Sequence, residues 1–361
     1  MKARLLNQPK DYERLGINPE KVEVWEDRRR NMNTAPNNWE WWYFDAMLDD
    51  GTTAIVQFFT KGGADIKSKG DHPSIMIKVD LPDGTHYQEY LKFKVSETSY
   101  GEDQCDVKFA NHYFKGDLKE YRIYVEQTNG LGADIKLESV ATPYRPGSSY
   151  IGFNSDEEYY TWLCAVPRGK VTGTLTVGGK TIQVSGRGYH DHQWGSFNIH
   201  KEFNHWVWAR QSFDDYTMLV FDMVTNKKTD YTRLPLVFIQ DKDGNLVFES
   251  TDNVACEVLE EYHDTETSDK IYPKSIKYTF ENDGKRVDYS LDMKNLIEAR
   301  GMKTIPVVMR MAMKTMKLNP SYARYLGESK LKLTDGDEII ERSGELIYEF
   351  MFSGDSFKGH M

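Results

Sequence analysis

Cysteine is scarce in this chain of 361 residues, which holds only Cys105, Cys164 and Cys256, far apart from one another. This spacing excludes a disulfide framework, and no Cys-x-x-Cys pair indicates zinc. Such cysteine usage is typical of a reducing compartment, and we expect the cytoplasm. No apolar run approaches the ~20 residues of a membrane-spanning helix, and the N-terminus lacks the apolar core of a signal peptide. The sequence therefore predicts no integral membrane segment.

An excess of basic residues is also missing. The chain has 46 Lys and Arg against 56 Asp and Glu, a formal net charge of −10. The basic residues are scattered, whereas contact with nucleic-acid phosphates needs a basic face, so we expect no nucleic-acid partner. No glycine-rich phosphate loop and no Gly-x-Ser-x-Gly motif occurs, which argues against nucleotide cofactors and a serine nucleophile. We expect no cofactor of any kind.

Aromatic residues, by contrast, make up 13% of the chain, which is high beside a mean hydropathy of −0.65. Aromatics favour strands and line apolar pockets. Turn dipeptides such as Asp50-Gly51, Gly178-Gly179 and Asp283-Gly284 separate runs that alternate between apolar and polar residues. This pattern predicts an all-β protein of antiparallel meanders, which usually close into barrels.

The length suggests two domains, since one domain takes ~150 residues. Turn density drops near residues 198–202, and a new series of strands begins at Trp206. We therefore predict an N-terminal extension over residues 1–30, one barrel domain over 31–200 and a second over 201–361.

Residues 302–326 differ from the rest of the chain. Between Pro306 and Pro320, four methionines accompany cations at helical spacing: Met309, Met311, Met313 and Met316, with Arg310, Lys314 and Lys317. The pattern predicts a short Met-rich helix with one basic face. Packing on a barrel end, a lid over an apolar site and transient contact with a membrane surface are the alternatives.

The first cluster that could carry chemistry is the run 38–45. On a strand, Trp39, Trp41 and Tyr43 share one face, while Glu40, Trp42 and Phe44 share the other. A carboxylate held between aromatic rings is poorly solvated, which is how a protein keeps a general acid protonated near neutral pH. In the alternative interpretation, Glu40 pairs with an arginine such as Arg187 or Arg210.

The second cluster is the run 186–195. Period two places Tyr189 and Asp191 on one face, with Arg187 and Gln193, and it places His190, His192 and Trp194 on the other. A tyrosine hydroxyl beside a carboxylate can donate and relay a proton. The alternative is a polar network in which Asp191 bonds to a histidine. A His-x-His pair can hold a metal only with a third ligand, and no spacing supplies one, so we assign no metal.

These two runs carry a family resemblance. Trp39-Glu40-Trp41-Trp42-Tyr43, followed roughly 145 residues later by Gly186-x-Gly188-Tyr189-x-Asp191-His192-x-x-Gly195, resembles the AttH-like and carotenoid 1,2-hydratase (hydroxyneurosporene synthase) family. Residues 322–327 and 344–349 resemble its C-terminal half less specifically. The resemblance implies two lipocalin-like β-barrels side by side with an apolar pocket. It also implies relatives that hydrate isoprenoid double bonds or cyclise polyenes, as fungal Diels–Alderases do, in secondary metabolism.

In the hydratases of this family, a His-x-Trp pair and a Tyr-x-Asp pair are the suspected acid–base groups. The second pair matches Tyr189 and Asp191, while Tyr160-x-Trp162 stands where the first belongs, with a tyrosine in place of the histidine. That departure weakens the case for carotenoid hydration itself. The resemblance thus implies these four as catalytic residues.

We expect the substrate to contact a second set of residues: Trp39, Glu40, Trp42, His190, His192, Trp194 and Trp208. The expected function is a cofactor-independent hydratase, cyclase or isomerase acting on an apolar, isoprenoid or polyene-like molecule. The alternative is a lipocalin-like carrier of a hydrophobic ligand without catalysis. The sequence does not fix an oligomeric state.

Overall fold

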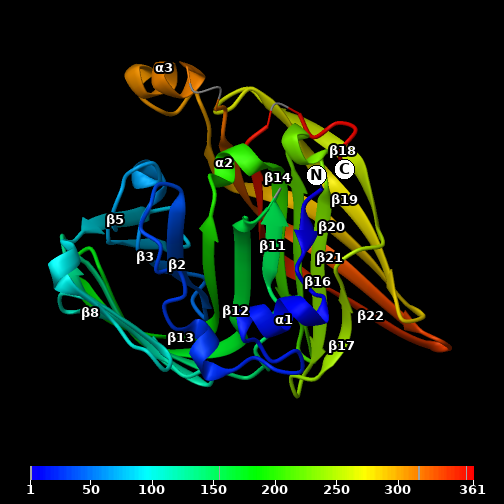
Figure 1. The fold of residues 1–361 in the computed structure, drawn as a ribbon, viewed down its shortest axis with the longest axis horizontal. Coiled ribbons are helices and arrows are strands. Elements are labelled where there is room, and N and C mark those ends of the chain that lie inside the picture. The colour runs from blue at the N-terminus through cyan, green and yellow to red at the C-terminus, as the bar shows by residue number, and fades with distance from the viewer. Residues whose placement is uncertain (1, 154, 316–317, 355) are drawn as a thin grey trace. The chain divides into compact units, whose positions relative to one another are not determined.

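The computed structural model describes residues 2–153, 155–315, 318–354 and 356–361. The chain divides into two compact units, Leu5–Phe197 and Asn198–Met361, the latter including the residues up to Arg4. Each unit is built on one curled antiparallel sheet, and the helices are few and short (Figure 1). This confirms the predicted all-β class.

The sheet of the first unit follows the order β5-β4-β3-β2-β13-β12-β10-β9-β8-β7-β6, with β11 paired to β12 and to β1. Strands β5 and β6 stand at the two ends of this order. The sheet therefore curls into a half-barrel, which is the form that the predicted lipocalin-like barrel takes in this unit. Its strands are β1 (Arg4–Leu5), β2 (Asn38–Leu48), β3 (Thr53–Phe59), β4 (Ser74–Asp80), β5 (His86–Lys92), β6 (Thr98–Tyr100), β7 (Cys105–Phe109), β8 (His112–Gly116), β9 (Glu120–Thr128), β10 (Leu131–Ser139), β11 (Tyr150–Phe153), β12 (Ser155–Val177) and β13 (Lys180–Ser196). The helical segments are α1 (Pro9–Leu15) and the 3-10 turns η1 (Val24–Asp27), η2 (Gly63–Asp65) and η3 (Val95–Glu97).

Hairpin turns form at the predicted turn dipeptides, and Gly178-Gly179 is the example that bears on the site. Between β12 and β13, Gly178 and Gly179 have φ values of 59° and 80°, a conformation that glycine adopts at little cost. This tight turn pairs β12 with β13 from Val177 to Gly169. Two register shifts follow, between Gly169 and Val166 and between Val166 and Leu163, and beyond them Trp162 lies opposite Gln193. The turn and these two irregularities together decide which side chains of the two strands become neighbours.

The core of the first unit lies on one face of its sheet. Along β2, Trp42, Phe44, Ala46 and Leu48 all enter the buried apolar cluster, as the period-two alternation predicts. Phe58 of β3, Phe114 of β8 and Trp194 of β13 belong to the same cluster, and so do Leu6 and Ile17 from the segment before β2.

The second unit repeats the design with a sheet in the order β17-β16-β15-β14-β22-β21-β20-β19-β18. Its strands are β14 (Phe203–Ser212), β15 (Tyr216–Thr225), β16 (Arg233–Asp241), β17 (Leu246–Ser250), β18 (Val254–Asp264), β19 (Lys270–Asn282), β20 (Lys285–Arg300), β21 (Ser321–Asp335) and β22 (Glu338–Phe352). Its helical segments are α2 (Ile199–Glu202), η4 (Lys227–Thr229) and α3 (Val307–Thr315). Its core cluster includes Val207, Val220, Tyr325 and Phe350.

The predicted Met-rich helix is α3, which joins β20 to β21. Of the residues that predicted it, Met316 and Lys317 lie outside the described residues. Across the ranges that the structure describes, no helix combines the length and the apolar character needed to cross a bilayer.

Candidate active site

Strand β13 lies between β2 and β12 and offers a different chemistry on each face. Its register pairs Asp191 with Tyr43 of β2 and Gln193 with Trp162 of β12. Alternation sends Tyr189, Asp191 and Gln193 to one face, and His190, His192 and Trp194 to the face of the apolar core. The side chains then follow this division in their contacts.

On the first face, the Asp191 carboxylate collects hydrogen bonds from its neighbours. The Tyr189 hydroxyl donates to Oδ2 at 2.8 Å, and the Trp162 indole Nε1 donates to the same oxygen at 3.2 Å. The Gln193 amide lies 3.1 Å from both carboxylate oxygens, and its own oxygen accepts from the Tyr160 hydroxyl at 2.7 Å. The structure thus brings together Tyr160, Trp162, Tyr189 and Asp191, the four residues that the resemblance implies as catalytic, and Gln193 links Tyr160 to Asp191.

The electrostatics of this network centre on Asp191, which is 2% exposed. Burial raises the pKa of its carboxyl to about 6, although the hydrogen bonds from Tyr189, Gln193 and Trp162 oppose the shift. Burial also holds the pKa values of Tyr160 and Tyr189 well above their usual range, so both hydroxyls remain proton donors. Asp191 can therefore gain or lose a proton near neutral pH while its neighbours keep theirs.

Aromatic rings border the network. The ring of Trp39 lies 6.1 Å from that of Tyr160 and stacks on Trp41 at 4.2 Å. Its indole nitrogen donates to the Phe197 carbonyl at 3.0 Å, which fixes the ring plane. Trp39 is thus the predicted substrate-binding residue that the structure places beside the Asp191 network.

On the opposite face, the two histidines of β13 bind carboxylates. His190 Nε2 lies 3.1 Å from Asp27 Oδ2, and His192 Nδ1 lies 3.1 Å from Asp27 Oδ1. His192 Nε2 lies 2.8 Å from Glu40 Oε1. Glu40 also accepts backbone N–H bonds from Arg30 and Asn31 at 2.6 and 3.0 Å. The alternative interpretation expected Glu40 to pair with an arginine such as Arg187 or Arg210, and this was wrong in the partner: the side chain that pairs with Glu40 is His192.

Packing around these histidines is close. Trp42 and Trp194 each lie 4.6 Å from the His192 ring, and Phe114 lies 4.6 Å from the ring of His190. Five predicted substrate-binding residues thus share the core face of β2 and β13 and pack against one another: Glu40, Trp42, His190, His192 and Trp194. Asp191 is bound by tyrosine, tryptophan and glutamine, and not by a histidine as the alternative network proposed.

Asp27, from η1, is the site residue that the sequence did not reveal. The Tyr121 hydroxyl donates to its Oδ2 at 2.5 Å. Burial opposes its ionisation, but His190 and His192 outweigh burial and hold the pKa of Asp27 below its usual range. Burial lowers the pKa of His192, whereas its bonds to Asp27 and Glu40 raise it. The two carboxylates have the larger effect, so the pKa of His192 lies above its usual range. Asp27 stands more than 160 residues from its histidine partners, so no local spacing could signal the contact.

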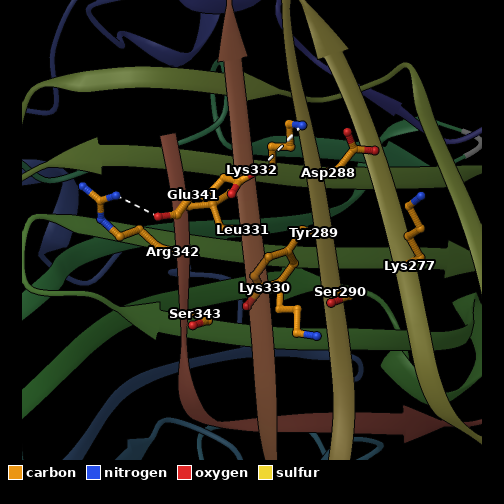
Figure 2. Close-up of a pocket in the computed structure, with 10 residues that line it drawn as sticks. All are labelled: Lys277, Asp288, Tyr289, Ser290, Lys330, Leu331, Lys332, Glu341, Arg342 and Ser343. Atoms are coloured by element: carbon orange, nitrogen blue, oxygen red, sulfur yellow. Dashed lines mark hydrogen bonds and ion pairs between the residues drawn. The ribbon is translucent and has the colours of Figure 1, made fainter. Parts of the chain in front are cut away.

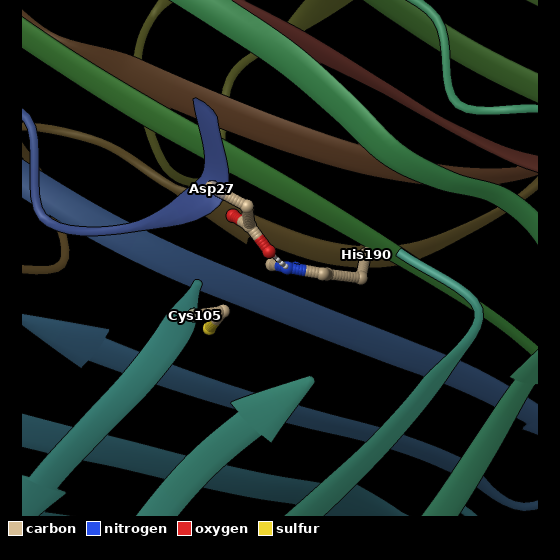
Figure 3. Close-up of side chains that lie close together, drawn as sticks. All are labelled: Asp27, Cys105 and His190. Atoms are coloured by element: carbon tan, nitrogen blue, oxygen red, sulfur yellow. Dashed lines mark hydrogen bonds and ion pairs between the residues drawn. The ribbon is translucent and has the colours of Figure 1, made fainter. Parts of the chain in front are cut away.

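Asp27, Cys105 and His190 form the one group of possible metal ligands found among the described residues, with ligand atoms within 4.8 Å of one another. Figure 3 shows Asp27 and His190 pointing toward each other, joined by their ion pair, with the Cys105 sulfur nearby. Burial holds the pKa of the Cys105 thiol well above its usual range, and a protonated thiol is a poor ligand. The cluster therefore fits a hydrogen-bonded core better than a metal centre.

A separate pocket of about 520 Å³ belongs to the second unit (Figure 2). Strands β19–β22 supply its lining, which includes the cations Lys277, Lys330, Lys332 and Arg342 and the carboxylates Asp288 and Glu341. The predicted site residues do not line it. Trp208, predicted to bind substrate, is a buried residue of β14 in this unit, and Arg210 lies 6.0 Å from its ring.

The family model described as AttH-like matches residues 31–304. The chain belongs to the AttH-like family. This confirms the resemblance drawn from the two motifs on β2 and β13, and the matched range covers both motifs in full.

Two curated relatives come from Emericella nidulans. The chain is 24% identical to the quinolone epoxide rearrangement protein asqO over 203 residues, which cover 53% of this chain and 56% of that protein. It is 24% identical to the ceramide-binding protein svf1 over 324 residues, covering 85% of this chain and 83% of svf1. The match to asqO thus spans little more than half of its length.

Solved structures share the fold. An AttH structure from Nitrosomonas europaea has a TM-score of 0.61 at 14% identity, covering 92% of this chain and 97% of that one. Kievitone hydratase from Nectria haematococca has a TM-score of 0.54 at 13% identity, covering 93% and 98%. At these identities the likeness establishes the fold alone.

Proposed function

We propose that this protein is an enzyme of the hydratase, cyclase or rearrangement kind that acts on an apolar small molecule by proton transfer through Asp191. The observation that carries the proposal is the buried carboxyl with a pKa raised to about 6, bound by Tyr189, Trp162 and Gln193. Relatives named for an epoxide rearrangement and for a hydratase support this reaction class.

In the proposed step, protonated Asp191 gives its proton to one carbon of a carbon–carbon double bond. The π-electron pair forms the new C–H bond and leaves a cation on the second carbon. The faces of Trp162 and Trp39 stabilise this cation by roughly 1–2 kcal/mol each when water is excluded. Addition of water, followed by return of a proton to Asp191, completes a hydration. Attack by a second double bond instead forms a ring and moves the cation to the far carbon of that bond, and loss of a neighbouring proton to the Asp191 carboxylate then gives a neutral cyclic alkene and restores the acid.

The remaining groups position the acid. Tyr189 and Trp162 both donate to Oδ2, while Oδ1 accepts only from Gln193 within the described residues, so Oδ1 is the oxygen we assign to the transferred proton. Tyr160 holds the Gln193 amide in place through its hydroxyl. Tyr160 is therefore assigned a positioning role.

A second candidate function is ligand carriage. The relative svf1, named as ceramide-binding, aligns with 85% of this chain, a larger share than asqO. In a carrier the Asp191 network would bind a polar group of an apolar ligand and transfer no proton. The two functions differ in one property, which is whether Asp191 is needed for a chemical change or only for affinity.

The test is native mass spectrometry of the protein after incubation with a polyene-containing lipid extract in D₂O. Wild type is compared with Asp191→Asn and with the exposed control Asp103→Asn. An enzyme releases a product that is 20 mass units heavier after hydration in D₂O, or an isomer carrying deuterium, and Asp191→Asn retains the unaltered substrate. Return of the same unaltered ligand by all three proteins would refute catalysis and favour the carrier.

A further inference from the structure

Aromatic side chains continue away from Asp191 along the same face of the sheet. Gln193, which binds Asp191, lies directly opposite Trp41 of β2 in the register. Trp41 in turn lies opposite Phe59 of β3, and their rings are 6.1 Å apart. The ring of Tyr90 on β5 lies 6.4 Å from that of Phe59. Trp41, Phe59 and Tyr90, which we call the aromatic track, therefore form a series of ring contacts that starts beside the Asp191 network.

Both ends of the track are held in position. The Tyr90 hydroxyl lies 2.8 Å from the Ser74 hydroxyl on β4, although β5 is the edge strand of the sheet. Gly62 leaves room for this contact, because a Cβ at that position would stand 2.4 Å from the Tyr90 oxygen. At the inner end, Trp41 stacks on Trp39 at 4.2 Å. Rings that are already ordered lose little conformational entropy when a ligand covers them.

Exposure of the rings rises with distance from Asp191. Trp39, beside the Asp191 network, is 2% exposed. Trp41 and Phe59 are half-buried, and Tyr90 is 41% exposed. Single exposed apolar side chains are common in soluble proteins, whereas adjoining exposed rings mark a surface that a ligand or partner covers. The gradient leads from solvent at the edge of the sheet to the buried carboxyl.

Charge is missing from this part of the sheet. Two rows of side chains cross β2, β3 and β4 on the Asp191 face: Trp41, Phe59 and Ser74 in one, and Tyr43, Gln57 and Met76 in the other. Neither row of these described residues contains a charged side chain, although charged residues make up 28% of the protein. An ionic ligand would therefore find no partner there, whereas a neutral apolar chain covers the rings without desolvating a charge. Strands lie about 4.8 Å apart, so the surface reaches roughly 20 Å from β13 to β5.

We propose that the aromatic track binds an extended, uncharged, unsaturated arm of the substrate while the bond that reacts lies at Asp191. A conjugated arm presents a flat π face to each ring, which is the geometry that aromatic side chains favour. The track makes length a criterion of selection, because an arm that ends at β2 contacts neither Phe59 nor Tyr90. The inference rests on the proposed function for the reaction at Asp191, and it adds the class of substrate.

The experiment is a fluorescence titration of the full-length protein with 1,6-diphenylhexatriene, a neutral rod-shaped triene that emits strongly only in apolar surroundings. We expect saturable binding by wild type. Trp41→Ala, Phe59→Ala and Tyr90→Ala should each weaken binding roughly tenfold, since each removes one ring contact. Tyr90→Phe keeps the ring and should bind as wild type does. Because Tyr90 is exposed on an edge strand, its two variants test the track even where Trp41→Ala destabilises the sheet.

The matched control is Tyr124→Ala on β9, near the other end of the sheet order, where the half-buried Tyr124 ring stacks on Tyr113 at 5.3 Å. It should bind the probe as wild type does, and unchanged circular dichroism and urea midpoints show which variants fold. Equal affinity in wild type and the folded track variants, an equal loss in the control, or no saturable binding would overturn the proposal. A dimer in sedimentation that Tyr90→Ala abolishes would also overturn it and identify a second copy as the occupant.

The two proposals fail in different ways. Suppose that the track variants bind the probe as wild type does while Asp191→Asn abolishes the product formed in D₂O. The track is then refuted and the proposed function stands. Suppose instead that wild type forms no product while the track variants lose the probe. Proton transfer at Asp191 is then refuted, and the track stands as the ligand site of a carrier.

Discussion

Replacing Asp191 by asparagine tests the electrostatics of the candidate active site without requiring a substrate. The change keeps the shape of the side chain, removes its ability to ionise and replaces one accepting oxygen by an amide NH₂. In the folded protein burial raises the pKa of Asp191 to about 6, whereas an unfolded aspartate has the ordinary value of 3.8. Between these two values the folded state binds the extra proton, so the contribution of Asp191 to stability falls as pH rises.

The size of the effect follows from that difference in pKa. At about 1.4 kcal/mol per pKa unit, the shift corresponds to roughly 3 kcal/mol of lost stability once the pH is well above 6. About 2 kcal/mol of this total falls between pH 4.5 and pH 7.5. Asp191→Asn lacks this titration. Relative to wild type, its free energy of unfolding should therefore rise by about 2 kcal/mol between pH 4.5 and pH 7.5.

The assay is urea unfolding followed by circular dichroism at both pH values, with each transition fitted separately. Comparing the two pH values cancels any hydrogen bond that the asparagine amide fails to make, because that loss is the same at both. The exposed Asp103→Asn should track wild type at pH 4.5 and 7.5. A stability difference between Asp191→Asn and wild type that stays constant with pH would refute the elevated pKa.

Three further changes test the core that supports this strand. Asp27→Asn leaves His190 and His192 without their carboxylate and should cost about 3–5 kcal/mol of unfolding free energy, measured at pH 6. Trp42→Ala should cost about 3–5 kcal/mol, while Trp42→Phe, which keeps a ring but loses the 3.0 Å bond to the Asp27 carbonyl, should cost less. Gly186→Ala should lower the free energy of unfolding by about 2 kcal/mol or more, because its Cβ would stand 2.4 Å from the Met47 carbonyl oxygen. At Gly63 an added Cβ meets no atom within 4 Å, so Gly63→Ala should be nearly neutral. Thermal or urea unfolding measures both.

The sequence predicted most of the strands and turns because the signals for them lie within a few consecutive residues. The alternation along β2 places Trp42 and Phe44 in the core, and the Gly178-Gly179 pair forms the turn that joins β12 to β13. The half-barrel form depends on which strands end the sheet, β5 and β6, and no turn or alternation encodes the distance between them.

The family motifs, more than any local pattern, pointed to the residues around Asp191. Tyr160, Trp162, Tyr189 and Asp191 belong to adjacent strands of one hairpin, but two register shifts between its turn and these residues set their final pairing, and the turn signal does not encode those shifts. Asp27 comes from a 3-10 turn whose charged neighbours resemble a surface segment, and only the completed sheet brings it to His190 and His192. For the same reason, the sequence could not name His192 as the partner of Glu40.

The two faces of β13 show that partners, more than surrounding rings, determine what a buried carboxyl does. Glu40 stands among tryptophans, as expected of a general acid, yet two backbone N–H groups and His192 bind it. Asp191 is equally buried, but its partners are a phenol, an indole and an amide, all of them neutral donors. Neutral donors offset only part of the cost of burying a charge, so the proton stays available near pH 6. On this ground we propose Asp191, on the face of β13 opposite the histidines, as the proton donor, because the bonds described for its carboxylate come from neutral groups.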